Sequence, residues 1–94
     1  MSTTVVGKRR DLLEGEIEMD PGDYGRSADH SGQWVFRAPV DPDTGRYFGV
    51  GALPLHTVIE HEDGTITVSP SILVTGHHGA TWHGWLEKGI WREA

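Results

Sequence analysis

The chain has 94 residues, no cysteine and a formal net charge of −6. This length allows one domain with a modest hydrophobic core, and the lack of cysteine excludes disulfides and thiolate metal sites. The acidic balance disfavours nonspecific binding to nucleic acid or to an anionic membrane surface. The sequence holds no apolar run of the ~18 residues that predict a transmembrane helix, and no apolar stretch near its start that would predict a signal peptide.

Residues 1–32 are predicted as an N-terminal arm followed by a long loop. The segments predicted within the arm are Thr3–Val6 as a strand or a free arm, Asp11–Glu14 as a single helical turn, and Glu16–Met19 as a short edge strand. The loop, Asp20–Gly32, is rich in Gly, Asp and Ser and exceeds the ~4–6 residues of most connections. Loops of that length are functional, mobile or packed against a partner, so Tyr24 within the loop is predicted as a contact residue.

Residues 33–94 are predicted as the β domain. Apolar runs between turn residues predict strands at Gln33–Ala38, Arg46–Gly51, Leu55–Glu62, Thr65–Ser69, Ser71–Thr75, Thr81–Glu87 and Ile90–Glu93. Val40–Gly45 is predicted as a turn, because Pro42 and Gly45 restrict its backbone. The sequence therefore predicts a small single-domain, mainly β protein. About five to seven short strands would form an antiparallel sheet, a sandwich or a barrel that ends in β-hairpins.

Asp63-Gly64 predicts the first of these hairpins, because an Asp-Gly pair suits the positive φ angles of a two-residue type I′ turn. A two-residue loop places Ile59 opposite Val68. Ile59 then shares the buried face of the sheet with Val68, whereas Val58 lies on the polar face. Pro70 lacks a backbone N–H, so the second strand is expected to end or to bulge there.

Lys88-Gly89 predicts a second hairpin at the end of the chain. Pairing across this turn places Leu86 opposite Trp91 and Trp85 opposite Arg92, and the second pair predicts a cation–π contact of roughly 0.5–1 kcal/mol. Trp85, Trp91 and Arg92 are predicted as contact residues for a partner, while Trp91 is also predicted as part of the core. The predicted core is Trp34, Phe36, Ile59, Ile66, Val68, Ile72, Val74, Trp82, Leu86 and Trp91.

Three of the six histidines, His77, His78 and His83, lie close together in the sequence. Three imidazoles, or two and a carboxylate, make a zinc site with an open position. Adjacent residues of an extended chain point to opposite faces, however, so His77 and His78 cannot easily bind one ion together. The other interpretation is a polar, glycine-rich loop at the rim of the sheet. Neither a Gly-x-Ser-x-Gly turn nor a phosphate-binding glycine motif is present, so no complete catalytic set indicates an enzyme.

The segment Thr67-Val68-Ser69-Pro70-Ser71-Ile72-Leu73-Val74-Thr75, followed by His83 and a closing hairpin, resembles a family of small bacteriophage proteins. Members of this family carry a phrase close to T-F-S-P-S-I-L-V-T and then a Cys-His pair where this chain has Trp82-His83. The resemblance covers about Gly64–Ile90. The family has no established activity, and the name ammonia monooxygenase that some members carry is supported by no residue here. The resemblance implies a phage or prophage origin and a compact β fold.

These observations lead to two hypotheses from different functional classes. The first is a non-enzymatic phage structural or interaction protein without a cofactor, for example a small capsid or tail component. Its partners would be phage assembly proteins or further copies of itself, and its location would be the virion or the host cytoplasm. The second is a His-dependent protein that binds zinc or another divalent metal, with His77 or His78, His83 and a carboxylate as ligands. Hydrolysis is the candidate activity of such a site.

Overall fold

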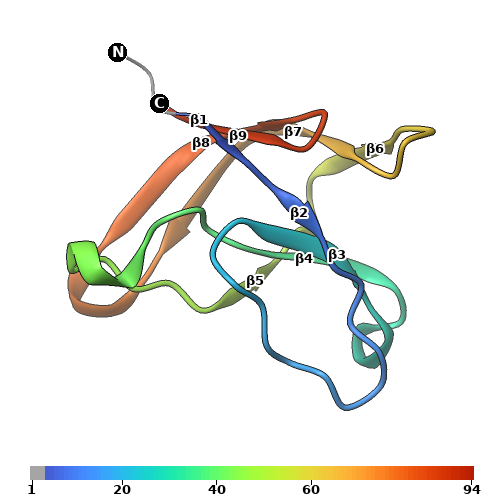
Figure 1. The fold of residues 1–94 in the computed structure, drawn as a ribbon, viewed down its shortest axis with the longest axis horizontal. Helices are drawn as coiled ribbons and strands as arrows, with labels where there is room; N and C mark the ends of the chain where they lie inside the picture. Colours follow the sequence, from blue (N-terminus) through green and yellow to red (C-terminus); the bar gives the residue numbers. More distant parts are fainter. Residues whose placement is uncertain (1–3) are drawn as a thin grey trace.

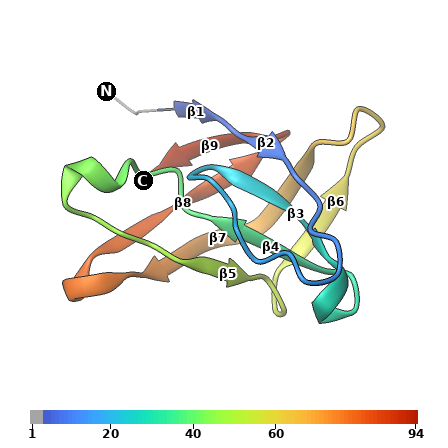
Figure 2. The ribbon, with the colours of Figure 1, turned by 60° about the horizontal axis from the view of Figure 1, so that its bottom comes forward.

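The computed structural model describes residues 4–94 as two β-sheets that pack against each other (Figure 1). One sheet has five strands in the order β1-β9-β8-β7-β6, and the other has four in the order β2-β3-β4-β5. The strands are β1 (Thr4–Val6), β2 (Lys8–Arg9), β3 (Asp23–Ser27), β4 (Gln33–Arg37), β5 (Val50–Ala52), β6 (Thr57–Glu60), β7 (Ile66–Thr75), β8 (Thr81–Glu87) and β9 (Ile90–Glu93). In Figure 2, β7 and β8 run across β3 and β4, so the two layers cross.

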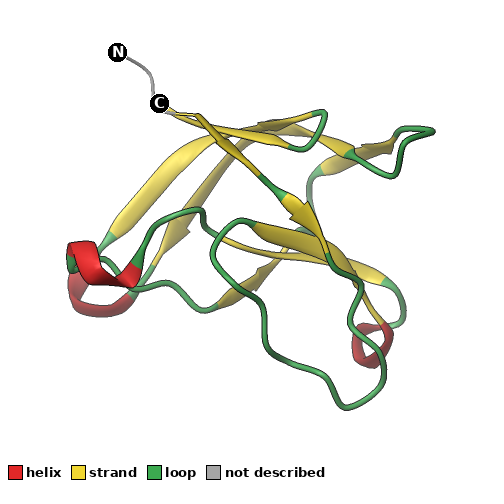
Figure 3. Ribbon diagram, viewed as in Figure 1, coloured by secondary structure: helices red, strands yellow, loops and turns green. Residues whose placement is uncertain are grey.

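The prediction of a small, mainly β, single-domain fold with C-terminal hairpins is confirmed. Within residues 4–94, helical structure is limited to the short 3₁₀ turns Ala28–His30, Pro42–Thr44 and His77–Gly79 (Figure 3). The helical turn expected at Asp11–Glu14 and the strand expected at Glu16–Met19 do not form. Strands outnumber the prediction because the N-terminal third contributes β1, β2 and β3.

The N-terminal segment belongs to both sheets. β1 pairs antiparallel with β9, and β2 pairs in parallel with β3. Gly7 lies where the chain passes from one sheet to the other, and its N–H donates to the Gly89 carbonyl at 2.8 Å. A Cβ at Gly7 would lie 2.8 Å from Trp91 Nε1, so only glycine allows the chain to cross this close to the core. Thr3, the first residue of the segment predicted as a strand or a free arm, lies outside the described residues.

The prediction that Asp20–Gly32 is a loop is wrong for the middle of this segment, where β3 pairs antiparallel with β4. The sequence of β3, DYGRS, contains no aliphatic residue, so it lacks the apolar pattern of a strand. β4, which is rich in aromatic and branched residues, supplies the pairing partner. A tertiary contact therefore imposes the extended conformation on a segment whose composition is typical of a turn.

Residues 10–20 cover the outer side of the four-stranded sheet. Leu12 and Met19 of this segment pack with Val35 of β4 in a small second cluster of buried residues. The backbone of Arg10 runs directly over Gly25 of β3, where an added Cβ would lie 2.2 Å from the Arg10 carbonyl oxygen. Hydrogen bonds from Arg10 N–H to the Tyr24 carbonyl and from Leu12 N–H to the Arg26 carbonyl hold the segment there.

The register predicted for the first hairpin is wrong by one residue. Val58, not Ile59, lies opposite Val68, and Val58 packs against the core while Ile59 is 54 % exposed. The loop contains three residues, because His61 N–H donates to the Thr65 carbonyl at 2.8 Å and Gly64 has a φ of +87°. Three-residue hairpin loops place a glycine in this left-handed conformation. One extra loop residue moves every side chain of the strand to the opposite face.

The second hairpin has the predicted register, with Leu86 opposite Trp91 and Trp85 opposite Arg92. The irregularity expected at Pro70 is also present, as a shift in the β7–β8 register between Val68 and Ile72. The two strands predicted on either side of Pro70 nevertheless form one ten-residue strand, β7. β7 and β8 therefore form the long central pair of the five-stranded sheet.

The core between the two sheets is dominated by aromatic residues. Trp91 is fully buried, with its ring 5.8 Å from Phe36 and 5.5 Å from Trp82, and its Nε1–H donates to the Gly22 carbonyl at 2.8 Å. All the predicted core residues are buried except Ile59, which is exposed, and Val74, which is partly buried. The core residues that the sequence did not predict are Leu12, Met19, Tyr24, Val35, Ala38, Val40, Phe48 and Leu53.

Candidate interaction surface

The side of the five-stranded sheet that points away from the core forms a continuous surface, here called the outer face. Side chains alternate between the two faces of a strand, so the buried positions and the register identify its members. They are Thr4, Val6, Thr57, Ile59, Thr67, Ser69, Ser71, Leu73, Thr75, Thr81, His83, Trp85, Glu87, Ile90 and Arg92. No segment of residues 4–94 packs over this face in the way that residues 10–20 cover the other sheet.

The outer face carries little charge although the chain is strongly acidic. Of the 14 Asp and Glu residues of the chain, only Glu87 belongs to it. Glu87 forms an ion pair with Arg92, the other charged member, at 3.2 Å. Hydroxyl side chains occupy most of the remaining polar positions. Depletion of charged residues is typical of the centre of protein–protein interfaces.

Three side chains form a stacked row in the middle of the outer face. The guanidinium of Arg92 lies 4.6 Å from the ring centroid of Trp85, which is the predicted cation–π contact. The ring of His83 lies 5.8 Å from Trp85, and Leu73 is paired with His83 across the strands. The row comes from β8 and β9, and Leu73 adds a neighbour from β7.

Four apolar side chains on the outer face are exposed to solvent. Val6 is 81 % and Leu73 is 67 % exposed, and Ile59 and Ile90 are exposed as well. A shallow groove of about 500 Å³ adjoins Ile90, and its other lining residues are Thr4, Thr67, Glu87, Lys88 and Arg92. Exposed apolar side chains that gather on one face, unlike those scattered singly, indicate an interaction site.

The structure separates the four predicted contact residues into two groups. Trp85 and Arg92 lie together on the outer face, in the predicted cation–π contact. Trp91 and Tyr24 are buried in the core, with at most 1 % of either side chain exposed, and they cannot contact a partner directly. Trp91 follows Ile90 on β9, so it points to the opposite side of the sheet.

The predicted metal ligands occupy different places. His77 and His78 lie in a 3₁₀ turn between β7 and β8, where the ring of His77 packs edge-on against Tyr47 at 5.0 Å. His83 lies on β8, and its Nε2 is 2.9 Å from Ser71 Oγ. Within residues 4–94, no three His, Asp or Glu side chains gather closely enough to hold a metal ion.

The contact between His83 and Ser71 has the distance of a nucleophile and its base. A catalytic pair of this kind also requires a third group that orients the base. No carboxylate in the described part of the chain hydrogen-bonds to His83. His56, the other imidazole at Ser71, contacts the Ser71 backbone carbonyl at 3.1 Å rather than the hydroxyl. The arrangement therefore matches a surface hydrogen bond between β7 and β8.

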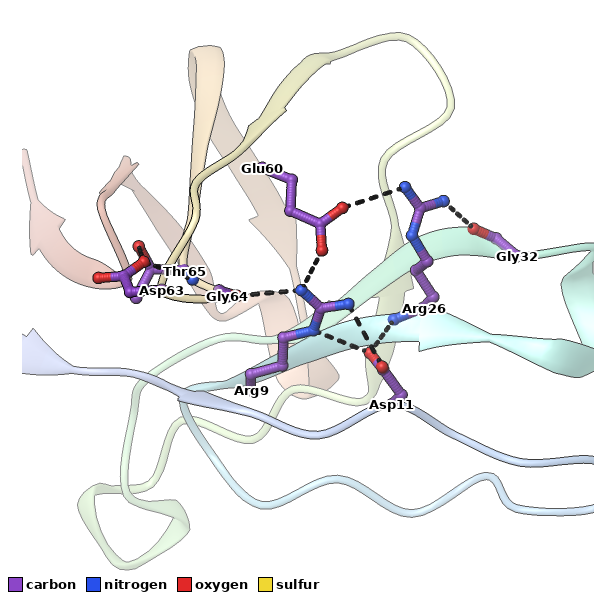
Figure 4. A network of polar contacts seen from close by, with 8 residues as sticks. All are labelled: Arg9, Asp11, Arg26, Gly32, Glu60, Asp63, Gly64 and Thr65. Carbon is purple, nitrogen blue, oxygen red and sulfur yellow. Dashed lines mark hydrogen bonds and ion pairs between the residues drawn. The ribbon is translucent and has the colours of Figure 1, made fainter.

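A second polar cluster, which the sequence did not predict, joins the two sheets at one edge (Figure 4). The guanidinium groups of Arg9 and Arg26 both lie over the Trp34 ring, at 4.9 Å and 4.4 Å from its centroid. Glu60, at the end of β6, forms ion pairs with both arginines. Asp11 accepts hydrogen bonds from the Arg9 side chain and from the Arg26 backbone N–H. Arg9 and Glu60 are 51 residues apart, and no local pattern indicates their contact.

The arginines change the acidity of both carboxyl groups. The hydrogen bond from Arg9 lowers the pKa of Glu60, and the charge of Arg26 lowers it further. Partial burial raises the pKa of Asp11, but the hydrogen bonds from Arg9 and from the Arg26 backbone outweigh this effect and lower it overall. Since unfolded carboxyl groups have pKa values of about 4, both groups stabilise the folded state above that pH. This contribution is lost as the pH falls through the lower, folded-state pKa values.

We therefore expect Glu60→Gln to lower the midpoint of urea unfolding at pH 7. The difference from the parent chain is expected to shrink as the pH falls below about 4 and to vanish once the carboxyl group is protonated in the folded state. Glu62→Gln is the matched control, because Glu62 is exposed and makes no ion pair in the described residues. A Glu60→Gln deficit that stays constant down to pH 2 would show that the charge of Glu60 is not its cause.

The described residues contain no helix with the length and apolar character needed to cross a membrane. A comparison with known proteins finds no family model, no curated protein and no solved structure that matches this chain.

Proposed function

We propose that the chain is a non-enzymatic interaction protein that forms part of a bacteriophage assembly, such as a capsid or tail, and that it makes its contact through the outer face. The observation that carries the proposal is the composition of this face. A chain with a net charge of −6 leaves a single internally neutralised acid there, beside exposed Val6 and Leu73 and the stacked Trp85. Covering such a surface removes few charges from water and gains free energy from the burial of apolar area.

The resemblance to a phage family supports the phage part of the proposal. The phrase that carries it, Thr67–Thr75, lies in β7, near the middle of the five-stranded sheet. Its alternate residues serve two purposes, because Val68 and Ile72 are buried in the core while Ser71 and Leu73 lie on the outer face. The most distinctive sequence of the chain therefore supplies side chains both to the core and to the proposed contact surface.

Co-purification with phage particles tests the proposal. The parent chain, expressed during infection by the phage that encodes it, is expected to sediment with intact particles. Leu73→Lys is expected to weaken binding to the particle at least tenfold, equivalent to about 1.4 kcal/mol of binding free energy, because it places a charge on the contact surface beside His83. Leu55→Lys is the control, because Leu55 is 91 % exposed in the β5–β6 connection and lies outside the outer face.

Two results would contradict the proposal. One is a parent chain that is absent from particles and from their assembly intermediates. The other is a particle-bound fraction that Leu73→Lys leaves unchanged while Leu55→Lys lowers it. Circular dichroism and urea unfolding of both variants would establish that the fold is retained, which is expected because both side chains are mostly exposed.

A further inference from the structure

We infer that the partner seated on the outer face is a second copy of this chain, packed face to face in a twofold-symmetric dimer. The inference rests on the proposed function, since it names the partner of the same surface. In an interface of this symmetry, the same patch contributes from both subunits, so the patch must be complementary to itself. The outer face meets this condition in its charge, its hydrogen-bonding groups and its apolar side chains.

Charge favours the outer face over the cover of the four-stranded sheet for self-association. Two copies that each carry a net charge of −6 repel one another. On the outer face the charges of Glu87 and Arg92 compensate within one subunit, so a second copy adds no repulsion there. The cover of the other sheet, in contrast, carries Glu14, Glu16, Glu18 and Asp20. Of these, Glu16 alone forms an ion pair in the described residues, with Arg10, so two such surfaces facing each other keep an excess of acid and would repel.

The six arginines, which are the basic residues other than Lys8 and Lys88, do not provide an alternative, head-to-tail contact. The arginines that form ion pairs within the chain are Arg9, Arg10, Arg26, Arg46 and Arg92. Arg37 donates to the carbonyl groups of Phe48 and Met19. No cluster of unpaired arginines among residues 4–94 is left to receive the acidic segment of a neighbouring copy.

Hydrogen-bonding capacity also points to a second copy. The polar positions of the outer face are mainly hydroxyl groups, namely Thr4, Thr57, Thr67, Ser69, Ser71, Thr75 and Thr81. A hydroxyl group both donates and accepts, so a row of hydroxyls can hydrogen-bond to a copy of itself. A row of carboxylates or ammonium groups cannot, because each offers only acceptors or only donors.

The apolar side chains complete the self-complementary pattern. Val6 lies directly opposite Ile90 across the β1–β9 pair, and Leu73 lies next to the row formed by His83 and Trp85. Sheets that pack face to face bury side chains from both layers between them. A second copy on the outer face would continue the layered packing of the two sheets within one subunit.

Sedimentation equilibrium of the full chain tests the inference. We expect a concentration-dependent mass that approaches twice that of one chain, and a dimer that becomes more stable as NaCl rises, since salt screens the repulsion between two acidic subunits. Leu73→Lys and, independently, Val6→Lys are each expected to weaken the dimer at least tenfold, because symmetry brings the new charge into the interface twice. Leu55→Lys is expected to leave the dimerisation constant unchanged.

A chain that remains monomeric up to millimolar concentration at high salt would overturn the inference. So would a dimer that Leu55→Lys weakens and both face variants leave intact. Should Leu73→Lys fail to fold, Val6→Lys in the edge strand β1 gives the same test, because its side chain is the more exposed of the two. A monomer that still sediments with particles would contradict the dimer alone, and a dimer that is absent from particles would contradict the proposed function alone.

Discussion

Replacement of Gly25 with alanine is expected to lower the free energy of unfolding by about 3 kcal/mol, at the upper end of typical overpacking costs. The new Cβ would lie 2.2 Å from the Arg10 carbonyl oxygen and 2.6 Å from its carbon. Both are backbone atoms, so no side-chain rotation relieves the clash. The segment that covers the four-stranded sheet must shift, and it then loses the hydrogen bonds that Arg10 and Leu12 donate to β3.

Urea unfolding monitored by tryptophan fluorescence would measure this loss. Gly49→Ala is the matched control, because a Cβ at Gly49 meets nothing within 4 Å and the residue has no positive φ. The control is expected to change the free energy of unfolding by no more than about 0.5 kcal/mol. Equal stabilities for Gly25→Ala and Gly49→Ala would contradict the placement of residues 10–12 on β3.

Trp91→Ala is expected to cost about 3–5 kcal/mol, the range for truncating a buried tryptophan. The substitution removes the ring that packs against Phe36 and Trp82 and leaves a cavity between the two sheets. It also leaves the Gly22 carbonyl without the hydrogen bond from Nε1. This loss is a large part of the stability of the folded state, since small domains have only about 5–15 kcal/mol.

Trp85→Ala provides a control of the same residue type in the same hairpin. Trp85 lies on the outer face, where it loses mainly its contacts with Arg92 and His83, so a cost of about 1 kcal/mol is expected. Thermal unfolding followed by far-ultraviolet circular dichroism would compare the two variants. A larger loss for Trp85→Ala than for Trp91→Ala would mean that the faces of β8 and β9 are assigned the wrong way round.

The C-terminal third illustrates what the sequence alone can predict. The bounds of β8 and β9 and their register follow from Lys88-Gly89 and the alternation on either side, because every determinant is local. The buried position of Trp91 also follows, since the predicted pairing places it opposite Leu86. Its prediction as a contact residue is wrong, because the alternation that places it opposite Leu86 also turns its side chain into the core.

The first hairpin shows where a local signal misleads. Asp63-Gly64 is compatible with a two-residue loop and with a three-residue loop that has glycine in its last position. The difference of one residue moves Ile59 from the core to the outer face. The even apolar pattern on either side could not separate these possibilities, because Val58 and Ile59 are equally suited to the buried position opposite Val68.

The remaining features depend on contacts between distant parts of the chain. β3 is a strand because β4 pairs with it, and Arg9 and Arg26 both reach the Trp34 ring because β2 and β3 are neighbours. Arg9 belongs to a short basic run that has the appearance of a solvated patch in the sequence. The outer face is similarly visible only after the strand order is known, because its members come from five separate strands.

Site-specific photocrosslinking would show whether the outer face contacts another protein. A photoreactive amino acid would replace Leu73 in one chain and Leu55 in another, each expressed during phage production. Leu73 lies on the outer face and Leu55 does not. We therefore expect efficient crosslinks from position 73 to a second copy of the chain or to a phage structural protein, and few crosslinks from position 55. Crosslinks from position 55 alone, with only solvent adducts at position 73, would contradict it.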